Sequence, residues 1–222
     1  MGGQPIGEPV DAIAGGVPGR ARREGRFVAL VPVDPDAHVG PLFDATRDAP
    51  EVWTYLGYGP FADEVAMRAW LSSLVPSGDP LFLTVIDRSS GSPIGVVAFM
   101  NVDRAMRHLE LGHIWYAPTA QRTRANTEVA YLMLREAFDE LGYRRVEWKC
   151  DALNARSRAA ADRLGFTFEG VFRQHMIVKG RNRDTAWFSM LDREWPRVRD
   201  NIERWLGAEP GALSLRELNE AR

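Results

Sequence analysis

The middle of the chain changes from one hydrophobic period to another, and this change limits the possible folds most strongly. Three β-rich runs follow one another at 81–87, 94–101 and 108–116. A helical pattern of apolar residues then covers 130–141, and a fourth β-rich run covers 146–151. Runs joined by short turns predict an antiparallel meander, whereas a strand, a helix and a strand predict a parallel pair. We therefore expect an α+β fold.

Further elements are predicted on both sides of this region. Residues 26–32 have the pattern of a first strand, and Asp34 and Asp63 are each placed to begin a short helix. A long hairpin is expected at 166–179 and 183–191, where the turn between the two runs contains glycine. These elements extend the predicted sheet at both ends.

The chain divides into three parts by composition. Residues 1–25 contain seven glycines and three prolines and almost no large apolar residue, so we expect them to be flexible. Residues 26–192 contain all the predicted strands and are expected to form one domain. Residues 193–222 are expected to add a helix over 194–206 and a polar tail.

Charge and cysteine content exclude several classes of function. The chain has 28 Lys and Arg against 30 Asp and Glu, a formal net charge of −2, which gives no reason to expect a nucleic-acid partner. No apolar run approaches the roughly 20 residues of a membrane span, so no membrane partner is expected. The single cysteine, Cys150, cannot form an internal disulfide, and no secretory segment is evident. Together these features favour a cytoplasmic location.

The segment 121–127, Gln-Arg-Thr-Arg-Ala-Asn-Thr, stands between a β-rich run and the start of the central helix pattern. Free backbone N–H groups and the helix dipole meet at such a junction and can hold an anion. Arg122 and Arg124 add positive charge, and Asn126 or Thr127 can cap the helix. Two interpretations remain open: a phosphate or pyrophosphate site, or a capped helix with two solvated arginines.

Several segments, taken in order, resemble the GNAT superfamily of acetyl-CoA-dependent acyltransferases over about residues 26–191. The segments are Leu-Glu-Leu-Gly-His-Ile-Trp-Tyr at 109–116, the 121–127 loop with Glu128 after it, Leu-Gly-Tyr-Arg-Arg-Val-Glu at 141–147, Asn-Ala-Arg-Ser at 154–157 and Leu-Gly-Phe-Thr-Phe-Glu-Gly at 164–170. The last segment is most similar to the branch that contains the ribosomal-protein serine and alanine N-acetyltransferases.

The resemblance implies a GNAT-like mixed α/β fold. Its central sheet is twisted and mostly antiparallel, with about seven strands, a splayed parallel pair and helices on both faces. Residues 26–192 would be the acetyltransferase domain. The implied activity moves an acetyl group from the cosubstrate acetyl-CoA directly to a primary amine, such as a peptide or protein N-terminus or a small-molecule amine, with no metal.

The resemblance also implies which residues contact acetyl-CoA. The family's pyrophosphate loop falls on Gln121, Arg124 and Asn126, and both of its glycine positions are substituted in this chain. A strand amide that stabilises negative charge on the acetyl group falls within 114–116. The expected cofactor-binding residues are Ile114, Trp115, Tyr116, Gln121, Arg122, Arg124, Ala125, Asn126, Thr127, Asn154 and Ser157.

The acid that protonates the departing thiolate differs from the one common in the family. Many members carry a tyrosine seven residues after the helix-capping asparagine, but the residue seven after Asn154 is Ala161. In the ribosomal-protein branch a serine three residues after the asparagine is implicated, and Ser157 has that position. A thiolate of pKa about 8.5 needs little help to leave near neutral pH. The alternative is that Ser157 only assists the start of the helix.

A general base is needed to remove a proton from the amine. Glu110 and Glu147 lie on central strands, where an unpaired carboxylate is costly to bury, so they are better candidates than surface acids. We take Glu110 as the first candidate, and the alternative is a paired structural glutamate. His175 and Asp184 on the late hairpin follow, with an exposed strand face as their alternative.

Strand alternation predicts which side chains share a face of the 108–116 run. It puts Glu110, Gly112, Ile114 and Tyr116 on one face and His113 on the other. The odd spacing of His108 and His113 points the two rings apart, and no other metal-ligand pattern is present. No metal site is therefore expected.

Two further hypotheses concern activity and assembly. Because both loop glycines and the helix tyrosine are substituted, a non-catalytic acyl-CoA-binding or interaction module is the alternative to an enzyme. The 166–191 hairpin offers a strand edge that could pair between subunits, which makes a homodimer possible.

Overall fold

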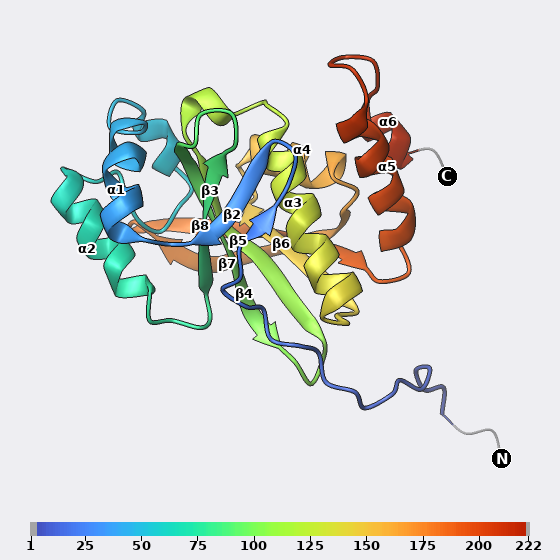
Figure 1. Ribbon diagram of the computed structural model, residues 1–222. Coiled ribbons are helices and arrows are strands. Elements are labelled where there is room, and N and C mark those ends of the chain that lie inside the picture. Colours follow the sequence, from blue (N-terminus) through green and yellow to red (C-terminus); the bar gives the residue numbers. More distant parts are fainter. Residues whose placement is uncertain (1–3, 221–222) are drawn as a thin grey trace.

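The structure is a computed structural model that describes residues 4–220. In this part of the chain eight strands form one sheet, in the spatial order β1-β2-β3-β4-β5-β6-β8-β7 (Figure 1). The strands are β1 (Arg23–Glu24), β2 (Val28–Pro32), β3 (Leu81–Asp87), β4 (Pro93–Asp103), β5 (His108–Tyr116), β6 (Arg145–Asp151), β7 (Thr167–Val178) and β8 (Arg181–Leu191). Neighbours are antiparallel except β5 and β6, which are parallel. The mixed, mostly antiparallel fold is thus confirmed, and β1 is the strand that was not predicted.

Helices cover both faces of the sheet, as predicted. They are α1 (Pro35–Asp44), α2 (Glu64–Leu74), α3 (Ala125–Arg135), α4 (Ala155–Arg163), α5 (Trp195–Gly207) and α6 (Leu215–Glu220), with short turns η1 (Pro50–Trp53) and η2 (Pro118–Ala120) and a π-helical turn η3 (Glu136–Glu140) that continues α3. Leu42 and Met67, from α1 and α2, pack on one face of the sheet against Phe82. Helices α3 to α6 pack on the other face (Figure 1).

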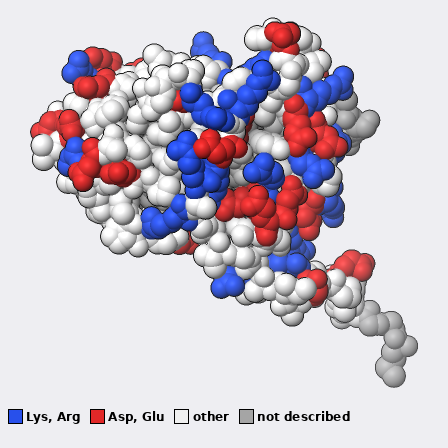
Figure 2. All heavy atoms as spheres, in the orientation of Figure 1, with Lys and Arg blue, Asp and Glu red and all other residues white. Residues whose placement is uncertain are grey.

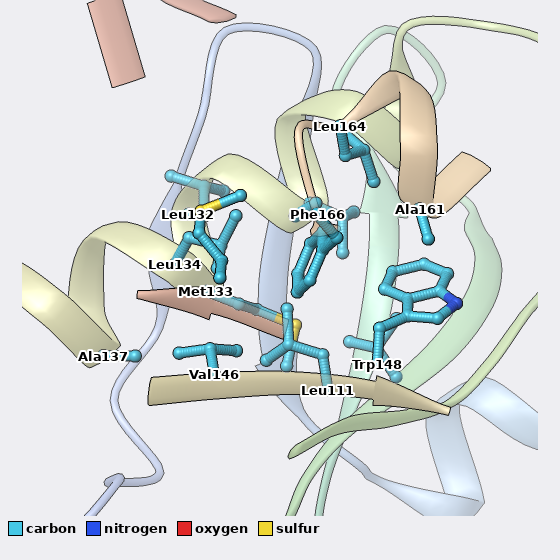
Figure 3. Packing of buried hydrophobic residues seen from close by; sticks show 14 of the residues in the cluster. Leu111, Leu132, Met133, Leu134, Ala137, Val146, Trp148, Ala161, Leu164 and Phe166 are labelled. Atoms are coloured by element: carbon cyan, nitrogen blue, oxygen red, sulfur yellow. The ribbon is translucent and has the colours of Figure 1, made fainter. Parts of the chain in front are cut away.

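The larger core lies between the sheet and α3 to α6. In Figure 3, Met133 of α3, Ala161 of α4 and Phe166 point toward Val146 and Trp148 of β6. All of these side chains are almost completely buried. Packing in this core holds α3 and α4 in position relative to the carboxyl ends of β5 and β6.

Three predicted helix starts are confirmed by side-chain caps. The Asp34 carboxylate accepts from the backbone N–H of Asp36 at 3.0 Å, and Asp63 accepts from Ala66 at 2.7 Å. Asn154 caps α4, because its Oδ1 accepts from the N–H of Ser157 at 3.0 Å.

The start of α3 differs from the prediction. The helix begins at Ala125, its N-cap residue is Arg124, and no side chain caps it. Asn126 and Thr127 therefore lie inside the first turn and are not caps. Thr123 Oγ1 accepts from the N–H of Ala125, the first residue of the helix, at 3.2 Å. Whether a residue caps a helix depends on its backbone angles as well as on its type, and the sequence did not reveal the backbone angles at the start of α3.

Part of the segment predicted to be flexible has fixed contacts. The Gly16 N–H donates to the carbonyl of Leu141 at 2.8 Å, and the Tyr143 hydroxyl donates to the carbonyl of Gly16 at 2.9 Å. Arg23 forms a buried ion pair with Glu136. The composition of residues 1–25 did not predict these contacts, because the segment makes them through main-chain groups of Gly16 and the side chain of Arg23. Residues 1–3 lie outside the described residues, and the domain boundaries at 25 and 192 stay predictions.

Glu128 ties the first long strand to α3. Its buried carboxylate accepts three backbone hydrogen bonds, from Arg26, Phe27 and Val28, at 2.6 to 2.7 Å. A Cβ on Gly25 would overlap this carboxylate, so the close approach depends on glycine. The first turn of α3 is therefore held against the start of β2.

The predicted polar tail contains a sixth helix, α6. Leu215 is buried, and Asn219 Nδ2 donates to the carbonyl of Arg163, the last residue of α4, at 2.9 Å. The Trp205 indole N–H of α5 donates to the carbonyl of Leu213 at 3.1 Å. The C-terminal residues thus pack against the ends of α3 and α4. No helix within residues 4–220 has the length and apolar character that a membrane crossing requires.

Candidate active site

Strands β5 and β6 pair along only part of their length. Their parallel register runs from His108 opposite Arg145 to Glu110 opposite Glu147, and no further pair follows. Beyond that point the two strands separate. A cleft of about 1720 Å³ opens there, lined by both strands, α3, α4, the 51–58 segment and the β7–β8 hairpin.

A bulge in β5 lies at the edge of this opening. Gly112 pairs with Ala98 and Trp115 pairs with Val96, so two residues of β5 stand opposite one residue of β4. His113 has φ of 52°, the left-handed region. Such a bulge takes backbone groups out of the strand ladder, next to the cleft.

The bulge changes which side chains share a face, so the predicted alternation is wrong beyond Gly112. Ile114 and Tyr116 pack with the core under α3, whereas His113 stacks on Tyr58 and Phe82 on the α1–α2 face. An extra residue in a strand of period two reverses every later side chain.

Two buried carboxylates share one ammonium group on the floor of the cleft. Lys149 Nζ lies 3.0 Å from Glu110 Oε2 and 3.0 Å from Glu147 Oε2, and 3.8 Å from the centre of the Trp187 ring. Asn101 Nδ2 donates to Glu110 Oε2 at 2.7 Å. The side chains of Glu110 and Glu147 are nearly inaccessible to solvent apart from their cleft surface.

The two carboxylates have opposite pKa shifts. Burial raises the pKa of Glu110, and this effect outweighs the opposing charge and hydrogen bond of Lys149. Burial also acts to raise the pKa of Glu147, but hydrogen bonds from Arg145 and Lys149 outweigh it, so that pKa is lowered. Glu110 is therefore the more basic of the two and the better proton acceptor.

Ser157 lies on the opposite wall, in the first turn of α4. The Trp148 indole N–H donates to Ser157 Oγ at 3.0 Å, and the serine hydroxyl is hydrogen-bonded to the Cys150 side chain, which lowers the pKa of that thiol against the effect of burial. Asn154, Ser157 and the β5 residues Ile114, Trp115 and Tyr116 all line the cleft. The structure therefore brings most of the predicted β5 and α4 residues together.

The 121–127 loop is divided between the cleft and the core. Gln121, Arg122 and Asn126 line the cleft, whereas Arg124, Ala125 and Thr127 do not. Arg124 has φ of −69°, an ordinary right-handed conformation, and Arg122 has φ of 61°. Substitution of the family's glycines at 124 and 126 therefore causes no backbone strain, because the left-handed residue stands at 122.

Arg124 points away from the cleft toward α5. Its Nη1 donates to the carbonyl of Leu206 at 2.9 Å, and Nη2 donates to the carbonyl of Ala208. The guanidinium also lies over the rings of Phe27 and Trp205. The prediction that Arg124 contacts a phosphate is not supported by this position, because its donors bind the C-terminal carbonyls of α5.

The hairpin wall of the cleft carries His175. Its Nδ1 lies 2.9 Å from Thr185 Oγ1, and its ring is exposed between Phe172 and Trp187. Asp184, the other hairpin candidate, lies outside the cleft and accepts from the N–H of Gln174 at 2.7 Å. His175 can thus reach a ligand, while Asp184 stabilises the bulge that carries it.

Aromatic residues from the 51–58 segment close the opposite side. Tyr55 and Tyr58 line the cleft, but Trp53 is buried beneath α1 and α2 and does not cover it. The Trp53 carbonyl accepts from Lys179 Nζ at 2.8 Å, which links this segment to the hairpin tip. Burial lowers the pKa of His113, which stacks on Tyr58, to about 4, so this ring is neutral at pH 7.

The chain matches the family described as Acetyltransferase (GNAT) domain over residues 28–167. It belongs to the GNAT family of acetyltransferases. A relative in Bacillus subtilis (strain 168), YdaF, named as a proposed ribosomal N-acetyltransferase, is 33% identical over 105 residues. That alignment covers 47% of this chain and 57% of the length of YdaF. The activity and substrates of the whole protein are therefore matters for proposal.

Solved GNAT structures agree with the fold. A GCN5-related N-acetyltransferase from Brucella melitensis is 42% identical and superposes with a TM-score of 0.89, covering 93% of this chain and 97% of that one. A second structure, the microcin C7 self-immunity acetyltransferase MccE in complex with acetyl-CoA and AMP, is 20% identical with a TM-score of 0.68, covering 75% and 93%. At that identity MccE shows the fold alone.

Lys149 and Arg163 are among the charged residues of the GNAT cleft that sequence reasoning missed. Lys149 bridges the carboxylates, and Arg163 lies in the wall near the start of α3. Lys149 shares a strand face with Glu147 at period two, which could have indicated it. Within residues 4–220 no group of three His, Cys, Asp or Glu side chains could hold a metal ion. Figure 2 shows basic and acidic side chains intermingled on the face drawn, consistent with the small net charge.

Proposed function

We propose that the protein transfers an acetyl group from acetyl-CoA to a primary amine. One observation carries the proposal: the β5 bulge, the buried carboxylate of Glu110 and the uncapped first turn of α3 all border the same cleft. The complex of MccE with acetyl-CoA and AMP supports acetyl-CoA as the cosubstrate, because this chain has the same fold.

The cleft offers suitable partners for acetyl-CoA. When bound, acetyl-CoA supplies an acetyl group activated as a thioester. The backbone N–H groups at 113–114, displaced from the strand ladder by the bulge, would donate to the acetyl oxygen as negative charge develops. The first turn of α3 would face the phosphates with the N–H groups that follow Ala125, because the side chain of its N-cap residue, Arg124, does not bind them.

Glu110 would accept the proton of the amine, directly or through one water molecule. Burial makes Glu110 more basic than an ordinary glutamate, and the charge of Lys149 partly opposes this rise of its pKa. Ser157 would turn its proton from the Cys150 side chain toward the departing sulfur, while its oxygen accepts from Trp148. His175 would contact the acceptor from the hairpin wall.

We propose a peptide or protein N-terminus as the acceptor class, with a small-molecule amine as the alternative. The similarity to YdaF supports the first. The cleft volume of about 1720 Å³, with lining residues from the 51–58 segment to the hairpin, also suits an extended substrate. We place the reaction in the cytoplasm. A homodimer through β7 stays a prediction, and the exposed side chains of Phe172 and Ile177 on that edge strand are consistent with it.

The competing function is a non-catalytic acyl-CoA-binding module. Ala161, where many relatives have tyrosine, still favours it. The substituted loop glycines favour it less, because Arg124 and Asn126 adopt right-handed conformations without strain.

Thiol release separates the two functions. The protein is incubated with acetyl-CoA and peptides that begin with Ser or Ala, with a polyamine, and with the same peptides blocked at the N-terminus as controls. Release with free but not with blocked peptides is expected. Binding of CoA by calorimetry with no thiol release from any amine would contradict the proposed transfer and favour the binding module.

A further inference from the structure

Arg163 has the environment of an anion-binding residue. It ends α4, its side chain lies in the wall of the cleft, and the guanidinium is largely buried. Nη1 donates to Thr127 Oγ1 at 2.8 Å, in the first turn of α3. Among residues 4–220 this arginine forms no ion pair, although a buried guanidinium has five donors to satisfy.

Other positive groups surround it. The N-terminal end of α3 carries a partial positive charge and no capping side chain, and Arg122 lines the same part of the cleft. Placing a buried cation beside a helix N-terminus is unfavourable unless an anion joins them. Burial accordingly lowers the pKa of Arg163.

Tyr116 adds an independent sign of a missing ligand. Its side chain is 92% buried at the end of β5, yet its hydroxyl has no hydrogen-bond partner among the described residues. Tyr116 also lines the cleft, as Arg163 does. A buried hydroxyl without a partner is costly, and an oxygen-rich ligand would satisfy it.

The C-terminal helices hold Arg163 in this position. Its guanidinium lies 5.9 Å from the centre of the Trp205 ring of α5, and Asn219 of α6 donates to its carbonyl. Trp205 also contacts Arg124, whose donors are used by α5. Of the arginines near the start of α3, Arg163 is therefore the one that is fixed by packing and lines the cleft, and among residues 4–220 its guanidinium donates only through the Nη1 bond to Thr127.

We propose that Arg163, assisted by the Tyr116 hydroxyl, binds a phosphate of the diphosphate group of CoA. This inference rests on the proposed function for the identity of the ligand. The contact with the diphosphate would thus come from Arg163 of α4, which α5 and α6 hold in place. The family resemblance had placed this contact on Arg124 of the 121–127 loop. A guanidinium presents two parallel N–H donors that match two phosphate oxygens.

Binding of CoA, measured by calorimetry without an amine, tests the proposal. Arg163→Met keeps the length of the side chain and removes its charge, and we expect at least a tenfold increase in the Kd for CoA. Tyr116→Phe removes a hydroxyl that has no partner in the free protein, and we expect a Kd about threefold higher. Arg158→Met is the matched control, because Arg158 lies on α4 outside the cleft and contacts Phe168.

Pantetheine, which lacks the diphosphate, distinguishes a phosphate contact from a structural role. Its binding should be equal in wild type and in Arg163→Met. An unchanged Kd for CoA in both variants, or an equal loss of CoA and pantetheine binding, would overturn the assignment of Arg163. Tight CoA binding without acetyl transfer would instead overturn the proposed function and leave the assignment standing. If the wild type binds no CoA, both are wrong.

Discussion

The two ends of the cleft are built differently. The helix end, lined by Tyr116, Arg122 and Arg163, has positive charge that pairs with no carboxylate among residues 4–220, and it is packed against α5. The hairpin end, lined by Glu110 and His175, has two carboxylates that pair with Lys149 and Arg145, and a wall made of the exposed edge strand β7. One cleft thus presents a rigid end with unpaired cations and a more exposed end with paired carboxylates.

This difference teaches how a single opening can hold two unlike ligands. Unpaired positive charge favours a phosphorylated ligand at the helix end, and carboxylates favour a cationic amine at the hairpin end. The β5–β6 separation joins the two ends, because it begins directly after the Glu110–Glu147 pair. If the two ends act independently, a substitution at one end should leave ligand binding at the other end unchanged.

The largest effect is expected for Glu110→Gln, which removes the proposed proton acceptor but keeps the hydrogen bond from Asn101. We expect kcat for thiol release to fall by about 10² to 10³-fold. The Kd for CoA should be unchanged, because the helix end is not altered. If Glu110→Gln retains full activity while His175→Ala loses it, the base is His175 and the assignment of Glu110 is wrong.

The aromatic side of the cleft, formed by the 51–58 segment and His113, should make stability depend on pH. The pKa of His113 is about 4 in the folded protein, below its unfolded value of about 6.5. The unfolded chain therefore binds a proton first as pH falls, so stability is lost between pH 6.5 and 4, by up to about 3 kcal/mol.

Denaturant unfolding across this pH range measures the loss. His113→Asn removes the titration and tolerates the left-handed backbone, so its stability should change less between pH 6.5 and 4. The same slope in both proteins would show that His113 does not carry this pH dependence.

Lys149→Met should move the pH profile of the reaction. Lys149 opposes the effect of burial on Glu110, so its removal should raise the pKa of Glu110 further. Because Glu110 acts when deprotonated, the acidic limb of kcat/KM should move to higher pH. Lys149→Arg keeps the charge and should restore the limb. An unchanged limb in Lys149→Met would mean that Glu110 does not set it.

The smallest effect is expected for Ser157→Ala. A thiolate leaves readily near neutral pH, so loss of the Ser157 proton should lower kcat by about tenfold or less. KM for the amine should stay the same, since Ser157 lies across the cleft from His175. A fall of more than 10³-fold would give Ser157 a larger role than this account allows.

The order of the elements could be predicted because it depends on local periodicity. The meander, α3 and β6 each show the spacing of apolar residues that is typical of their own secondary structure. Asp34, Asp63 and Asn154 cap helices through backbone N–H groups two or three residues away. Glu110 could be selected for the same local reason, as a carboxylate on a central strand. These features involve residues a few positions apart.

The rest of the site depends on contacts between distant residues. The bulge at His113 is accompanied by stacking on Tyr58 and Phe82, and no local pattern reveals it. The family resemblance assigned Arg124 to the cofactor. The sequence could not reveal its actual partner, the carbonyl of Leu206, because that residue lies 82 positions away. Arg163 was not noticed, because only the fold places it beside the start of α3.

A crystal structure of the protein with CoA tests the central claim most directly. The account predicts the sulfur beside the β5 bulge and within reach of Ser157, with the diphosphate between Arg163 and the first turn of α3. Glu110 should then face the sulfur from the hairpin end. CoA bound outside the β5–β6 opening, or with its sulfur turned away from the bulge and Glu110, would contradict the account.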